Sequence, residues 1–128
     1  MDRKLLNDLT GVIINCAIEV HRNLGPGLLE HTYKIALLQE LKLCNLRAEK
    51  EVEIPLTYKG IKLDTAYRAD IVVENEIILE LKATENDNPL FYKQLLTYLR
   101  IADKRVGLVI NFNKSVLKNG IKRIVNDF

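Results

Sequence analysis

The sequence has no tryptophan, only three prolines and only two cysteines in 128 residues. Cys16 and Cys44 fall in apolar stretches with helical spacing, so we expect buried thiols in a reducing compartment. No CxxC pair or cysteine–histidine cluster indicates zinc. No apolar run approaches the ~20 residues that a transmembrane helix needs. Because the polar start leads directly into an amphipathic pattern, we expect no signal peptide and a cytoplasmic protein.

A strong net charge is absent as well, since 19 basic residues face 17 acidic ones and leave +2. That balance does not by itself indicate a nucleic-acid-binding protein. Seven basic and only two acidic residues follow position 99, which permits either a phosphate-facing surface or a solvated helix face. With 48% hydrophobic and 28% charged residues, the composition is that of one globular domain, which we assign to residues 1–128.

Two amphipathic helices are predicted in the first third of the chain. Apolar residues recur at helical spacing from Leu5 to Val20, and this helix should end near Asn23 because Gly25-Pro26-Gly27 cannot continue it. A second helix is predicted from about residue 28 to residue 43. Its inward face should comprise Leu29, Tyr33, Ala36, Leu37 and Leu41.

From Glu49 the pattern alternates as in a strand. Lys59-Gly60 is a turn signal, residues 61–73 read as one return strand or two short ones, and residues 76–82 form the next strand. The buried face of the first strand should carry Val52, Ile54 and Leu56.

The remaining third predicts a helix, a strand and a final helix. Asn86-Asp87-Asn88-Pro89 provides a loop and a helix start, so a helix is expected over about 90–102. The apolar run 106–110 predicts a strand buried on both faces. The final helix should carry Leu117, Ile121, Ile124 and Val125. This order predicts an α/β sandwich with a mixed four-stranded sheet and a right-handed strand–helix–strand crossover.

The segment that could carry chemistry runs from Asp70 to Lys82. Glu80 and Lys82 share a strand face because they are two residues apart. A three-residue hairpin loop would pair Asp70 with Glu80, whereas a two-residue loop would turn Asp70 to the other face. Adjacent carboxylates repel each other unless a cation lies between them, and oxygen ligands suit Mg²⁺ or Mn²⁺. The alternative is a solvated strand face with cross-strand ion pairs.

The arrangement Asp70…Glu80-Leu81-Lys82 resembles the PD-(D/E)XK nuclease superfamily, whose restriction-endonuclease-like core has the same order of elements. Ala69 stands where the name of the superfamily has proline. Gly27-Leu28-Leu29-Glu30-His31-Thr32-Tyr33 also matches the signature of the GxxExxY protein family, a branch of that superfamily. The likeness runs from about Ile13 to Ile124 and includes the stretches 20–27, 58–60, 67–70 and 107–112.

The resemblance implies a set of metal ligands and a catalytic lysine. Asp70 and Glu80 would bind Mg²⁺ or Mn²⁺, helped by the backbone carbonyl of Leu81 and by Glu30. Lys82 would position the attacking water. Glu30 also falls in the first turn of its helix, where an acid stabilises the helix dipole, so helix capping is its alternative role.

The resemblance also implies contacts with the substrate. Gln94 and Tyr98 look like the QxxxY motif of exonuclease-type relatives, which lies beside the active site, and an ordinary helix–sheet packing face is the alternative. His21 is a further candidate base, with packing as its alternative. Basic residues that would contact the nucleic-acid backbone are Lys114, Lys118, Lys122 and Arg123.

These observations favour a metal-dependent phosphodiesterase that acts on nucleic acid, with DNA as the expected substrate. A second copy of the chain could be needed to cut both strands. The alternative is a non-catalytic nucleic-acid-binding or protein-interaction module on a nuclease fold, since fold does not fix function. A purely structural domain is the third reading. The sequence has no Ser/His/Asp arrangement, phosphate-binding loop or dinucleotide fingerprint.

Overall fold

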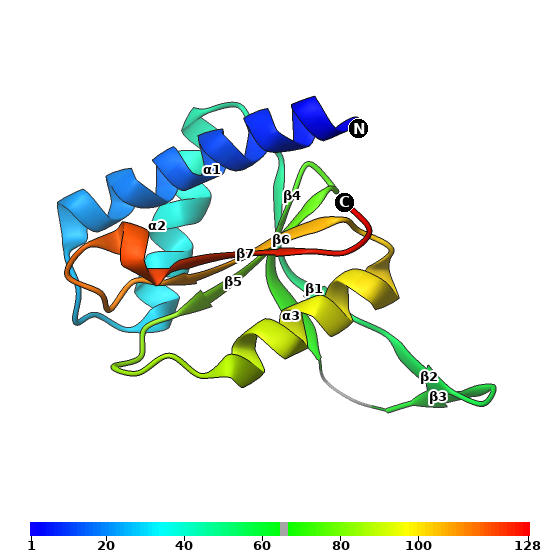
Figure 1. Cartoon of the computed structure of the whole chain (residues 1–128). Coiled ribbons are helices and arrows are strands. Elements are labelled where there is room, and N and C mark those ends of the chain that lie inside the picture. The colour runs from blue at the N-terminus through cyan, green and yellow to red at the C-terminus, as the bar shows by residue number, and fades with distance from the viewer. Residues whose placement is uncertain (65–66) are drawn as a thin grey trace.

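A computed structural model describes residues 1–64 and 67–128 of the chain (Figure 1). The described helices are α1 (Arg3–Leu24), α2 (Glu30–Leu43), α3 (Pro89–Ala102) and a short 3₁₀ helix, η1 (Leu117–Gly120). The described strands are β1 (Ala48–Glu53), β2 (Leu56–Tyr58), β3 (Ile61–Leu63), β4 (Arg68–Val73), β5 (Ile77–Lys82), β6 (Val106–Asn111) and β7 (Ile121–Val125).

The architecture is a mixed sheet between two layers of helices, which confirms the predicted α/β class. The strand order is β1-β4-β5-β6-β7, and β2 with β3 forms a separate hairpin that projects from the body (Figure 1). Helices α1 and α2 pack on one face of the sheet and α3 packs on the other. None of the helices in the described ranges is both long and apolar enough to cross a membrane.

Helix α1 follows the prediction closely. The Asp2 side chain caps it by accepting a hydrogen bond from the Leu5 N–H at 2.8 Å, and the helix ends at Leu24 before the glycine–proline turn. Its Cys16 is buried as expected, but Cys44 is exposed, because it lies at the C-terminal cap of α2 beyond the last helical turn. The prediction of two buried thiols is therefore wrong for Cys44.

Helix α2 begins two residues later than predicted. Leu29 is its N-cap in extended conformation and is 78% exposed, so its predicted inward position is wrong. Gly27, at φ 98°, holds the preceding segment in a loop that a helix cannot include. Tyr33, Leu37 and Leu41 are buried as predicted.

The β4–β5 hairpin has the register that brings Asp70 opposite Glu80. Ile71 pairs with Leu79 and Val73 pairs with Ile77 across the loop of residues 74–76, so the three-residue alternative is the one observed. The predicted strand after Glu49 is divided at Pro55 into β1 and β2, because proline lacks the N–H that a continuing ladder needs. The return segment contains two strands, β3 and β4; positions 65–66 lie outside the described residues.

The crossover from β5 through α3 to β6 confirms the expected parallel pairing. Asn88 caps α3 by accepting a hydrogen bond from the Leu90 N–H at 3.0 Å, and Pro89 occupies the first turn. All six residues of β6 are buried, because helices cover both sheet faces and β5 and β7 flank the strand.

The predicted final helix is wrong, and with it the four-stranded sheet. Residues after η1 form β7, which pairs antiparallel with β6 and makes a fifth strand. Gly120 lies against the end of β6, where a Cβ would be 2.3 Å from the Asn111 carbonyl oxygen. The chain must turn there, and β-branched Ile121, Ile124 and Val125 then favour the strand. Ile121 packs on the α1 side and Ile124 on the α3 side, so their helix-like spacing serves two faces of a sheet.

Candidate functional site

The carboxyl groups of Asp70 and Glu80 meet on the face of the sheet that α3 covers. Asp70 Oδ2 accepts a hydrogen bond from the Leu81 N–H at 2.7 Å, which fixes one carboxyl against the backbone of β5. Glu80 is only 4% exposed. Its Oε1 is buried and has no hydrogen-bond partner among the described residues. A buried, unpaired carboxyl oxygen is costly, so this atom is suited to a ligand.

Burial is the main cause of a large change in the acidity of Glu80. The pKa of this carboxyl is raised to about 9, first by burial and then by the negative charge of Asp70 and a hydrogen bond shared with it. The ammonium of Lys82 opposes the rise. The two carboxyls are thus close enough to share a proton, which is the arrangement that a cation between them would relieve.

Lys82 leaves the same strand face and lies against α3. Its Nζ is 4.5 Å from the centroid of the Phe91 ring, a distance at which the cation is attracted to the ring face. The aromatic ring limits the positions of the lysine, and the charge acts on the carboxyls of both Glu80 and Glu30. Lys82 is therefore at the site predicted for it.

Glu30 approaches this site from the start of α2. Partial burial raises the pKa of Glu30, and the charge of Asp70 raises it further, whereas Lys82 and Lys34 lower it. Glu30 thus faces the carboxyl pair, although it is exposed at the rim. Within residues 1–64 and 67–128, no three or more Asp, Glu, His or Cys side chains are grouped closely enough to hold a metal ion. Glu30 therefore does not complete a three-ligand cluster in this arrangement.

The loop before α2 is held by Tyr33. The buried Tyr33 hydroxyl donates to the Gly25 carbonyl at 2.6 Å and accepts from the Leu28 N–H at 3.1 Å. Its ring stacks on Phe112 with centroids 4.5 Å apart. The glycine, glutamate and tyrosine of the GxxExxY pattern therefore have distinct tasks: Gly27 turns the chain, Tyr33 fixes the loop, and Glu30 faces the carboxyls. The turn and the place of Glu30 near the carboxyls were expected from the sequence, whereas for Tyr33 the sequence predicted burial and not its hydrogen bonds.

Asn111 is a positioning residue that sequence reasoning missed. It is buried at the end of β6, where its side-chain oxygen accepts hydrogen bonds from the Thr84 N–H at 3.2 Å and the Asn113 N–H at 3.1 Å. Its amide nitrogen donates to the Thr84 carbonyl at 3.0 Å and to Asp87 Oδ1 at 3.3 Å. These bonds tie the loop after Lys82 to β6. The sequence signals were a polar residue at the end of an apolar strand and its place in the stretch 107–112, which the family resemblance includes.

His21 also has a structural partner. Its Nε2 lies 2.7 Å from the carbonyl oxygen of Lys114, which joins the end of α1 to the segment after β6. This contact supports the packing role of His21 rather than that of a catalytic base.

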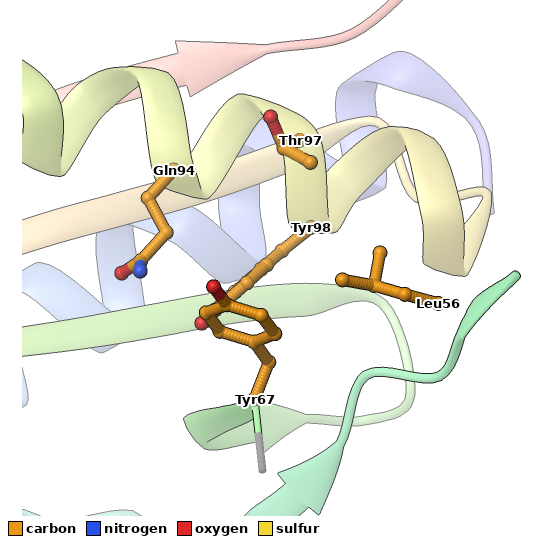
Figure 2. Close-up of a pocket in the computed structure, with 5 residues that line it drawn as sticks. All are labelled: Leu56, Tyr67, Gln94, Thr97 and Tyr98. Carbon is orange, nitrogen blue, oxygen red and sulfur yellow. The ribbon is translucent and has the colours of Figure 1, made fainter. Parts of the chain in front are cut away.

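A small pocket opens between α3, β2 and the start of β4 (Figure 2). Its volume is about 210 Å³, and its lining residues are Leu56, Tyr67, Gln94, Thr97 and Tyr98. Tyr98 is 5% exposed. Its pKa is raised to about 12, chiefly by burial and then by the charges of Glu80, Tyr67 and Asp70. The Tyr98 hydroxyl is therefore within electrostatic range of the carboxyl pair, and Gln94 lines the same pocket.

The four basic residues predicted to contact nucleic acid do not form one surface. Lys122 lies 5.9 Å from the Tyr92 ring on the α3 side of the sheet. Arg123, on the α1 side, lies 4.5 Å from the Phe128 ring and donates to Asn7. Lys118 lies beside Ile14 and Ile18 of α1, and Lys114 pairs with Asp87 at 3.2 Å. Of the four, only Lys122 is thus on the sheet face that α3 covers, and Lys114 contacts the loop between β5 and α3.

The donors at the carboxyl pair fit a hard divalent cation. Asp70 and Glu80 present oxygen atoms alone, one of them buried without a partner, and sulfur or imidazole ligands are not part of the pair. Mg²⁺ commonly binds through one or two carboxylates and completes its shell with waters and substrate phosphate, so two protein carboxyls suffice. The backbone carbonyl of Leu81 stays an expected ligand.

Comparison with known proteins gives a family match. A family model described as the PD-(D/E)XK nuclease superfamily matches residues 7–124, which is nearly the whole chain. No curated protein and no solved structure gives a significant match.

Proposed function

The chain belongs to the PD-(D/E)XK nuclease superfamily, and on this premise we propose that it is a metal-dependent hydrolase of phosphodiester bonds in nucleic acid, with DNA as the expected substrate. One observation carries the proposal. Asp70 and Glu80 meet on one sheet face beside Lys82, with a buried Glu80 oxygen that has no partner in the described part of the chain.

Asp70 and Glu80 would hold Mg²⁺ or Mn²⁺, with the Leu81 carbonyl as a third oxygen and Glu30 at the rim. A bound divalent cation supplies Lewis-acid stabilisation of the charge that develops on the phosphate. The Leu81 N–H holds Asp70 in place before any ligand arrives. A carboxyl fixed in this way loses little conformational entropy on binding.

Lys82 would orient the attacking water and stabilise negative charge on the phosphate. Its ammonium is held near the Phe91 ring, close to both Glu80 and Glu30. A fixed cation in a partly buried site stabilises a developing anion more than a solvated one does. Gln94, on the adjoining turn of α3, would contact the substrate at the edge of the site.

A narrower assignment concerns the GxxExxY protein family. The contacts of Tyr33 and the positive φ of Gly27 give that signature a physical purpose, which is to hold Glu30 toward the carboxyl pair. These contacts support membership of that branch. Nucleic acid is the proposed partner, and a homodimer is expected if both strands of a duplex are cut.

Metal binding is the first test. Calorimetric titration with Mn²⁺ and Mg²⁺ should show binding to the wild-type protein and at least tenfold weaker binding to Asp70→Asn and Glu80→Ala, because each loses a ligand. Glu49→Gln, an exposed acid on β1, is the matched control and should bind as the wild type does. A wild-type protein that binds neither ion would overturn the proposal.

Cleavage of plasmid and single-stranded DNA is the second test. Lys82→Ala should lose about 10²-fold or more in rate while still binding metal, as expected when a group that acts in the transition state is removed. Lys50→Ala, on the exposed edge strand β1, should keep the wild-type rate. Metal binding without cleavage of DNA or RNA would favour the non-catalytic binding module instead.

A further inference from the structure

The pocket beside α3 is lined by two aromatic rings, one of which is partly exposed to solvent. The rings of Tyr67 and Tyr98 meet edge to face, with centroids 6.3 Å apart and an interplanar angle of 63°. Tyr98 is fixed by burial, whereas Tyr67 is 41% exposed. Leu56 adds an apolar wall from β2 (Figure 2). A planar ligand that enters the pocket would therefore contact the free part of the Tyr67 ring and an apolar side wall.

The mouth of the pocket is polar and its volume is small. The exposed Gln94 side chain extends from α3 toward the two tyrosines (Figure 2), so its amide offers both a donor and an acceptor. The Thr97 hydroxyl donates to the Lys93 carbonyl at 3.1 Å and keeps its lone pairs as acceptors. At about 210 Å³, the pocket is smaller than the ~300 Å³ lower bound of drug-sized pockets, which favours a single planar ring system.

The distance between the pocket and the carboxyl pair is one that a short single strand can span. Tyr67 precedes Asp70 by three residues, and three residues of strand span about 10 Å. A short stretch of single strand bridges that separation, with one base in the pocket and a phosphate at Asp70 and Glu80. The pKa of Tyr98, raised in part by the charges of those carboxyls, agrees with this proximity.

The β2–β3 hairpin, which carries the pocket-lining Leu56, also carries cationic side chains. Lys59 and Lys62 are exposed there, Lys59 Nζ lies 5.4 Å from the Tyr58 ring, and the hairpin projects beyond the sheet (Figure 1). Basic and aromatic side chains together are the usual means of binding single-stranded nucleic acid. Lys62 lies on the hairpin face opposite Leu56 and pairs with Glu53 at 3.8 Å, so Lys59 is the cation that accompanies an aromatic ring in this hairpin.

From this arrangement we propose that the pocket binds one unstacked nucleobase of a single-stranded segment, with Tyr67 as the stacking residue and Gln94 at the base edge. The inference rests on the proposed function, since it assumes that nucleic acid is the substrate, and it deepens it. A base within a duplex is stacked on both faces and cannot enter, so the pocket selects single strands, frayed ends or flipped bases.

The test compares two fluorescent 12-nucleotide probes of equal charge, oligo(dT) and an abasic strand, in a chelator so that no cleavage occurs. The wild-type protein should bind oligo(dT) about tenfold or more tightly than the abasic strand, since stacking on an aromatic ring contributes that much per base. Tyr67→Ala should bring this ratio close to one without weakening abasic binding. Tyr67→Phe, which keeps the ring, should retain the ratio.

Ile35→Ala is the control, because it removes an exposed apolar side chain of α2 that does not line the pocket. It should keep the ratio of the two affinities, and thermal melts should show that each variant is folded. Equal binding of the two probes by the wild-type protein, or no binding of either, would overturn the inference. Base-dependent binding without any cleavage would contradict the proposed nuclease activity but not base binding in the pocket. Cleavage without base-dependent binding would contradict base binding in the pocket but not the nuclease activity.

Discussion

At the scale of single residues, the buried carboxyl of the candidate site lowers the stability of the ligand-free protein. The Glu80 carboxyl occupies a buried position on a sheet face where Ile78 and Val72 pack against α3. A carboxyl at such a position must either keep a proton or find a cation. The features that prepare this residue to hold a ligand are therefore the ones that disfavour the ligand-free fold at alkaline pH.

Replacement of Glu80 by glutamine should stabilise the protein in a chelator. The folded-state pKa of about 9 lies above the ordinary value of 4.5 for this carboxyl, so the folded protein binds more protons than the unfolded chain between these values. The contribution of Glu80 to stability is therefore fully present below about pH 4.5 and is lost as the pH rises toward 9. Glu80→Gln does not titrate, and urea unfolding at pH 8 should show a gain of about 1–3 kcal/mol.

The same comparison at pH 5 gives the control, because the gain should shrink there to a small value. Added Mn²⁺ should stabilise the wild-type protein and leave Glu80→Gln nearly unchanged. An equal difference between the two proteins at pH 5 and pH 8 would show that burial of Glu80 does not raise its pKa.

Tyr33 offers a second test at this scale. Tyr33→Phe keeps the stack on Phe112 but leaves the Gly25 carbonyl and the Leu28 N–H without their hydroxyl partner. We expect a loss of about 1–2 kcal/mol in urea unfolding, typical of buried groups left unpaired. Tyr58→Phe, on an exposed tyrosine, should change stability by a few tenths of that. No loss in Tyr33→Phe would mean that the hydroxyl does not hold the loop.

At the scale of elements, local patterns predicted helices and hairpins better than the end of the chain. The helix start at residues 86–89 and the turn at Lys59-Gly60 follow from neighbouring residues and are as the sequence indicates. For β4 and β5 the sequence left two registers open, and the structure has the one with the three-residue loop. The segment after Gly120 depends on a partner, because β7 gains its hydrogen bonds from β6. The helical spacing of Leu117, Ile121 and Ile124 could not reveal that the edge of β6 was available for pairing with this segment.

Two glycine substitutions test the turn into β7. Gly120→Ala should destabilise the protein by roughly 1–3 kcal/mol, because its Cβ would lie 2.3 Å from the Asn111 carbonyl oxygen. Gly11→Ala is the matched control in the exposed interior of α1, where nothing lies within 4 Å of the added Cβ, and should stabilise by about 0.5–1 kcal/mol. Urea unfolding measures both. Equal effects of the two changes would contradict the close approach at Gly120.

At the scale of the whole molecule, the sheet separates residues that the sequence groups together. The carboxyl pair was predictable because Asp70, Glu80 and Lys82 belong to one hairpin, and the expected α/β class follows from the order of elements. The pocket could not be predicted from the sequence, because Leu56, Tyr67 and Tyr98 come from three parts of the chain that tertiary packing brings together. Lys122 and Arg123 are adjacent in sequence but lie on opposite faces, as neighbours in a strand must.

That separation predicts unequal effects on nucleic-acid binding. Lys122→Ala, on the α3 side with the site, should weaken binding of a single-stranded probe about two- to tenfold and lower the salt slope by about 1. Arg123→Ala, on the α1 side, should leave binding unchanged and slightly lower thermal stability, since it contacts Asn7 and Phe128. Fluorescence polarisation at several salt concentrations measures both. A larger effect of Arg123→Ala would place the substrate on the other face.

The projecting β2–β3 hairpin has a consequence for motion. Strand β6 is buried along its whole length, so its amide hydrogens should exchange with solvent only when the entire domain opens. The hairpin has few buried residues, and its amides should exchange through frequent local opening. One wall of the pocket is therefore on α3, and the other, Leu56, is on a hairpin that opens locally. A base that enters the pocket would slow amide hydrogen exchange in the hairpin and leave exchange in the five-stranded sheet unchanged. Binding of a base would therefore be detected as local ordering of the hairpin.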